Sequence, residues 1–109
     1  MYIVQKAGHY LHEAIGVYDR IDVAKAFAAE ALSQERDDYH QYKIYYRSPE
    51  AAVTYTYPVM ILSNAQGKIY VDTYIDGVLQ SCSLYEKEDF ATFYAVLAFQ
   101  FRYLADQED

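Results

Sequence analysis

Residues 68–85 constrain the fold most strongly, because two β-prone runs flank the dipeptide Asp76-Gly77. In residues 68–75, Ile and Val alternate with Tyr and Asp, and residues 78–85 form the second run. Both positions of the dipeptide tolerate the positive φ that a type I′ turn needs. The sequence therefore predicts an antiparallel hairpin with strands at 68–75 and 78–85.

Periodicity places the other elements. The alanine-rich segment 22–36 has one apolar and one polar arc on a helical wheel, which indicates a helix that packs on one side. The predicted elements are strands 2–6 and 15–18, helix 22–36, strands 39–47 and 53–62, the hairpin, and a helix ending near 105. Pro58 cannot donate to a strand ladder, so strand 53–62 is expected at an edge or bulged. This order, ββαβ-βββα, predicts an α+β fold with a mainly antiparallel sheet of about five to six strands and two helices on one face.

The length of 109 residues predicts a single domain over 1–109, with a candidate break at 48–50 and a frayed tail at 106–109. No apolar run reaches the roughly 18 residues that a membrane span requires. The single cysteine, Cys82, cannot form an intramolecular disulfide, which favours a reducing compartment. We therefore expect a cytoplasmic protein that makes no membrane contact.

The charge balance is acidic, with 9 basic and 16 acidic residues and a formal net charge of −7. Binding to phosphates gains from a basic surface, so direct nucleic-acid binding is not expected. Mimicry of DNA would need a nearly continuous row of negative charge, whereas these carboxylates are scattered among Lys and Arg. Solubility and helix capping explain the acidic residues better than DNA mimicry does.

The last helix carries apolar residues on two sides. The broad stripe expected in the core consists of Phe90, Phe93, Tyr94, Leu97, Ala98, Phe101 and Leu104. Nearly opposite lie Ala95, Val96, Phe99 and Tyr103. A helix outside a two-layer domain needs only one such stripe. Either the helix is sandwiched between the sheet and the first helix, or Val96, Phe99 and Tyr103 are exposed and bind a partner or a second copy.

Tyrosine is unusually frequent, with 14 Tyr beside 5 Phe and no Trp. Its apolar ring and polar tip make it common at protein interfaces. Tyr39, Tyr45, Tyr70, Tyr74 and Tyr85 share strand faces with Lys, Asp and Arg. We predict that Tyr70, Tyr74 and Tyr85 contribute to a partner contact; if helices cover both faces of the sheet, these rings are semi-buried instead.

Residue types that could support catalysis or metal binding do not form a recognisable cluster. His9, His12 and Glu13 lie in a predicted loop beside a strand, and the distant His40 adds no second cluster. Cys82 alternates with serines along a strand and is expected to be buried and unreactive. We expect no enzyme activity, no cofactor and no metal site, with a small ligand-binding domain as an alternative.

The first 47 residues follow a recognisable layout of hairpin, alanine-rich helix and tyrosine-bearing strand. The runs that carry it are Tyr2-Ile3-Val4, Gly16-Val17-Tyr18-Asp19, Val23-Ala24-Lys25-Ala26-Phe27-Ala28 and Tyr39-His40-Gln41-Tyr42-Lys43-Ile44-Tyr45. This layout resembles that of small accessory proteins of bacteriophages and mobile elements, including anti-CRISPR proteins. The resemblance implies a non-enzymatic, cofactor-free protein that occludes a surface of a host defence or nucleic-acid-processing complex in a bacterial cytoplasm. The alternative is a self-assembling, homodimeric structural protein.

Overall fold

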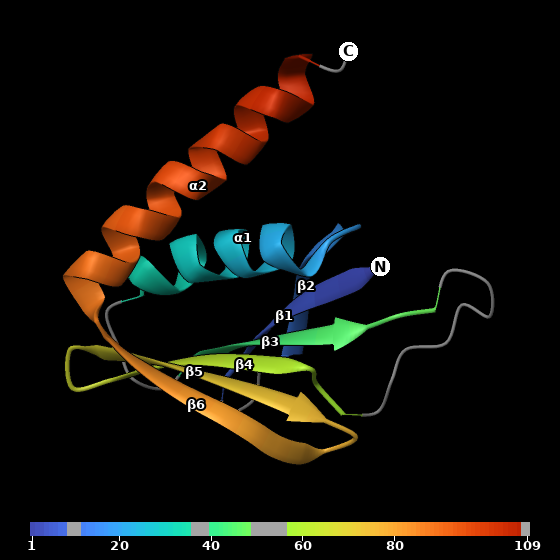
Figure 1. Ribbon diagram of the computed structural model, residues 1–109, viewed down its shortest axis with the longest axis vertical. Helices are drawn as coiled ribbons and strands as arrows, with labels where there is room; N and C mark the ends of the chain where they lie inside the picture. Colours follow the sequence, from blue (N-terminus) through green and yellow to red (C-terminus); the bar gives the residue numbers. More distant parts are fainter. Residues whose placement is uncertain (9–11, 36–39, 49–56, 108–109) are drawn as a thin grey trace.

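The computed structural model describes residues 1–8, 12–35, 40–48 and 57–107, where the elements follow one another in the predicted order (Figure 1). They are β1 (Tyr2–Ala7), β2 (His12–Tyr18), α1 (Ile21–Ser33), β3 (Gln41–Tyr46), β4 (Met60–Ala65), β5 (Lys68–Ile75), β6 (Val78–Glu86) and α2 (Lys87–Gln107). The strands form one antiparallel sheet in the order β2-β1-β3-β4-β5-β6. The predicted α+β class and the order ββαβ-βββα are confirmed.

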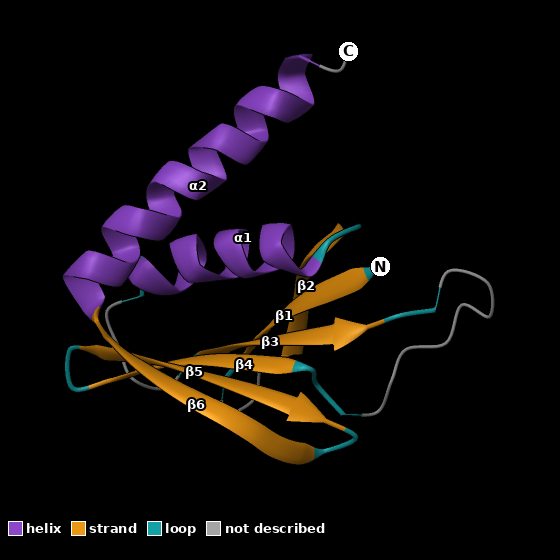
Figure 2. Cartoon of the chain, in the orientation of Figure 1, coloured by secondary structure: helices purple, strands orange, loops and turns teal. Residues whose placement is uncertain are grey.

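The core lies between the sheet and α1 (Figure 2). Alternation along each strand sends every second side chain to one face, so Val4, Ile44 and Leu62 are buried on the side that α1 covers. Val4 pairs with Ile44 across β1 and β3, and the same face continues into β4. The helix meets this face with buried alanines and Leu32, since small side chains let a helix approach a sheet closely. The alanine-rich composition of α1 is thus explained by packing.

Helix α2 packs mainly on α1 and forms a further layer above it. It begins directly where β6 ends, and only its first part reaches β5 and β6. Figure 1 shows it rising from the end of β6 across α1, with its C-terminal turns standing clear of the sheet. Both helices therefore lie on one side of the sheet, but the second does not cover the sheet itself.

Strand β4 differs from its predicted counterpart. It begins at Met60, beyond Pro58, and lies between β3 and β5, so the predicted edge or bulged position is wrong. Because Pro58 precedes the ladder, its missing N–H removes no sheet hydrogen bond. Helix α2 includes residues 106 and 107 of the predicted tail. The predictions for His9, Tyr39, residues 49–56 and residues 108–109 fall outside the described residues.

Cys82 is exposed, so the prediction that it is buried is wrong. Its strand, β6, is at the edge of the sheet, and nearly all of that strand's side chains are exposed. Cys82 lies on the sheet face that points away from the helices, because alternation separates the two faces of a strand but does not show which one a helix covers. Cys82 pairs across the ladder with Asp72, and the hydrogen bond to that carboxylate is the main reason that the pKa of the thiol is raised. A raised pKa makes the thiolate scarce, which agrees with the expected low reactivity.

Candidate partner-binding surface

The inner side of α2 is the side that holds this helix on the domain. Phe90, Tyr94 and Ala98 recur at helical spacing and are all buried. The rings of Phe90 and Tyr94 lie 4.5 Å apart, and Tyr85 of β6 packs 5.2 Å from Phe90 on the other side. This aromatic cluster joins the start of α2 to the end of the sheet.

Two polar contacts tie α2 to α1 at separate points along its length. Near its start, Lys87 Nζ donates to the backbone oxygen of Glu35, at 2.9 Å. Towards its other end, the guanidinium of Arg102 donates to both carboxylate oxygens of Glu30, with Nη1 to Oε2 at 2.8 Å, and lies over the ring of Phe27. The Arg102 hydrogen bond holds the pKa of Glu30 below its ordinary value. Contacts at both ends fix which side of α2 faces the domain.

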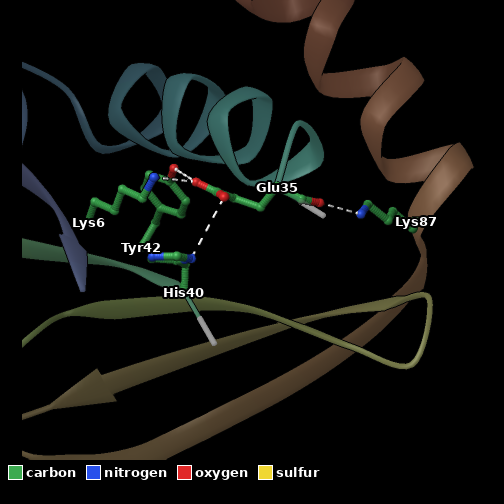
Figure 3. A network of polar contacts seen from close by, with 5 residues as sticks. All are labelled: Lys6, Glu35, His40, Tyr42 and Lys87. Atoms are coloured by element: carbon green, nitrogen blue, oxygen red, sulfur yellow. Dashed lines mark hydrogen bonds and ion pairs between the residues drawn. The ribbon is translucent and has the colours of Figure 1, made fainter. Parts of the chain in front are cut away.

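Figure 3 shows the polar network around Glu35, just beyond the end of α1. Its carboxylate pairs with Lys6 at 2.6 Å, accepts a hydrogen bond from the Tyr42 hydroxyl at 2.8 Å and lies 3.8 Å from His40 Nδ1. The pKa of the Glu35 carboxylate is lowered. The hydrogen bond from Lys6 is the largest cause, and the hydrogen bond from Tyr42 lowers it further. This half-buried carboxylate is held by groups from the sheet, so we assign the network a structural role.

The outer face of α2 bears the largest concentration of exposed apolar side chains on the described helices. We define it as Phe93, Val96, Phe99, Tyr103 and Leu104, each of which is between 55% and 69% exposed. Val96, Phe99 and Tyr103 are thus exposed, and α2 is not sandwiched. Phe93 and Leu104 were expected in the core and are instead exposed, because among the described residues no element packs over these two positions of α2.

The three tyrosines predicted on the sheet do not join this outer face. Tyr70 pairs with Leu84, and Tyr74 with Leu79, on the sheet face that points away from the helices. Both rings are half-buried. Tyr85 instead points to the helix side, where it packs on Phe90. The structure therefore separates the six predicted contact residues into the outer face of α2, the far face of the sheet and a position beneath the start of α2.

Hollows flank the outer face at both of its ends. Near its start, a hollow of about 300 Å³ lies between Tyr85, Phe90 and Phe93. Near its other end, a hollow of about 530 Å³ runs between β2, α1 and α2, with Phe27 and Leu104 among its lining residues. Phe93 and Leu104 thus join the exposed stripe to these hollows. Sequence reasoning missed them because they lie at the margin of the core arc, where the helical wheel alone does not decide exposure.

Within the part of the chain that the structure describes, no group of three His, Cys, Asp or Glu side chains is placed to hold a metal ion. Among those same residues, no helix is both long and apolar enough to cross a membrane. Comparison with known proteins found no matching family model, no similar curated protein and no similar solved structure. Functional inference therefore rests on the surface itself.

Proposed function

We propose that this chain is a non-enzymatic protein-binding module whose contact surface is the outer face of α2. The supporting observation is its exposed apolar area. Aromatic side chains contribute about 200 Å² each when fully exposed. At the observed exposures, the five side chains of the outer face present roughly 500 Å², within the range of the largest patches on monomeric proteins, which are often functional.

The chemistry of this face also resembles the centre of a protein interface. Such centres are rich in Tyr, Phe and Met and poor in charged residues. Between residues 90 and 105 the sequence contains one charged residue, Arg102, and its guanidinium is engaged with Glu30 beside the face. A partner would therefore meet aromatic and aliphatic groups, whose removal from water on contact is favourable.

Affinity capture with matched baits tests this proposal. The wild-type chain, Phe99→Asp and Ile15→Asp are immobilised and exposed to a bacterial lysate. Ile15 is an exposed apolar residue of β2 that does not line the hollow beside α2, so its substitution adds the same charge outside the outer face. We expect wild type and Ile15→Asp to retain the same partner and Phe99→Asp to lose it, while all three keep the same circular dichroism spectrum. Equal capture by all three would contradict the proposal.

The narrower proposal is that the partner is a host defence or nucleic-acid-processing complex, which the chain inhibits by occluding a surface. It is supported by the layout of residues 1–47 and by the acidic charge, which disfavours direct binding to nucleic acid. The proteins retained by wild type but not by Phe99→Asp identify the complex. If none belongs to such machinery, the inhibitor proposal fails while the binding-module proposal stands.

A further inference from the structure

We propose that the outer face of α2 packs against the same face of a second copy of this chain, so that the module works as a two-fold dimer. This inference rests on the proposed function, because it assigns a second copy, in place of a host complex, as the occupant of the same surface. It leaves the far face of the sheet, with Tyr70 and Tyr74, uncovered in both copies. The dimer would therefore present that face twice.

The exposed area fits a pair of copies. One outer face presents roughly 500 Å², so two such faces meeting would bury about 1,000 Å² in total. This is the lower bound for a specific protein interface. A two-fold interface uses the same patch on both subunits, so each apolar side chain on one copy finds an apolar surface on the other.

The spacing of the face suits contact with another helix. Phe93, Val96, Gln100 and Tyr103 follow one another at intervals of three, four and three residues. This is the a/d spacing with which two helices pack along a common seam. Gln100 is the one polar member, and a single polar residue in such a seam is a known way to fix register. A second copy supplies a helix with the matching pattern.

The outer face carries no like charges that would oppose contact with a second copy. Each copy has a net charge of −7, and the resulting repulsion is least where the contact surface has no carboxylates. The outer face has none, because no Asp or Glu occurs between residues 90 and 105. Two copies can therefore join their outer faces without bringing carboxylates together within the seam. Figure 1 shows that the C-terminal turns of α2 stand away from the sheet.

The test is the mass of the chain in solution, measured by sedimentation equilibrium over a range of concentrations. The wild type should give twice the chain mass of 12.7 kDa. Loss of one buried interface aromatic weakens an interface by about 30-fold, and each dimer would lose two, so Phe99→Asp, at a position that flanks the a/d seam, should raise the dissociation constant by about 1,000-fold. Tyr103→Ser, which adds no charge, should also weaken the dimer, and Ile15→Asp should leave it unchanged. Because these side chains are exposed, circular dichroism and melting of the monomer should be preserved.

A wild-type chain that is monomeric at every concentration would overturn the inference. So would a dimer that resists both Phe99→Asp and Tyr103→Ser, because its contact would then lie elsewhere, as at the free edge of β6. The two proposals fail separately. A monomer whose capture of another protein depends on Phe99 keeps the proposed function and loses the dimer, whereas an outer face that affects neither mass nor capture removes both.

Discussion

Phe90 and Phe99 provide a matched pair for testing which side of α2 faces the domain. They are the same residue type on one helix, but Phe90 is 2% exposed and Phe99 is 69% exposed. Truncating a buried Phe to Ala costs about 3–5 kcal/mol, and Phe90 also loses ring contacts with Tyr85 and Tyr94. We expect Phe90→Ala to lower the free energy of unfolding by about 3–4 kcal/mol. Phe99→Ala should change it by about 0.5 kcal/mol or less, since Ala regains helix propensity where little packing is lost.

The measurement is urea unfolding followed by circular dichroism, in dilute solution where the monomer is the species that unfolds. The denaturant slope should be the same for all three proteins, because each unfolds the same surface. Small domains have a total stability of about 5–15 kcal/mol, so a loss of 3–4 kcal/mol should be resolved while the variant remains folded. Equal losses for the two variants, or a larger loss for Phe99→Ala, would refute the assignment of the inner and outer sides of α2.

Three further predictions concern the contacts that position α2 and the turns. Glu35→Gln should lower the free energy of unfolding by about 2 kcal/mol at neutral pH through loss of charge-assisted hydrogen bonds. Pairing lowers the pKa of Glu35 in the folded state, so the stability difference between wild type and Glu35→Gln should be complete above the unfolded pKa of about 4.3. It should disappear as the pH falls through the lower folded pKa. A stability difference that acid leaves unchanged would contradict this prediction. A double-mutant cycle on Arg102 and Glu30 should give a coupling free energy of about 0.5–1 kcal/mol. This coupling should weaken with added salt, because the Arg102 side chain is half exposed. Gly77→Ala and Gly67→Ala should each lower the free energy of unfolding by about 1–2 kcal/mol, measured by thermal or urea unfolding, because both glycines have positive φ. Gly77→Ala should have the larger effect, because a Cβ at Gly77 would lie 3.1 Å from the ring of Tyr57, whereas a Cβ at Gly67 would have nothing within 4 Å.

Local signals in the sequence were sufficient to predict the type and order of the elements, although not the bounds or the position of β4. The turn Asp76-Gly77 has φ values of +51° and +80°, and β5 and β6 end and begin on either side of it, as the dipeptide predicted. Alternation in β1, β3 and β5 and the apolar arc of α1 likewise depend on residues close in the chain. Fold class and element order follow from such patterns because each pattern is repeated within one element.

Burial that depends on distant elements could not be predicted in the same way. Cys82 was expected in the core, yet it pairs with Asp72 on the sheet face that carries Tyr70 and Tyr74, away from the helices. Phe93 and Leu104 belong to the apolar half of the helical wheel, yet both are exposed on α2. Periodicity separates the faces of a strand or helix, but it does not show which face a neighbouring layer covers or how far that layer reaches. The angle at which one element crosses another is a tertiary property that periodicity does not contain.

The outer face of α2 contributes little to the stability of one copy, and this supports its assignment as a contact surface. Phe, Tyr and Val are poorer helix formers than Ala, Lys or Glu, so these side chains disfavour the helix slightly where they lie in water. The inner side, with Phe90, Tyr94 and Ala98, already holds α2 on the domain. Covering the outer faces of two copies would remove about 1,000 Å² of mainly apolar surface from water, which is the lower bound for a specific protein interface. In the proposed dimer, these five side chains therefore contribute to association and not to the folding of the single chain.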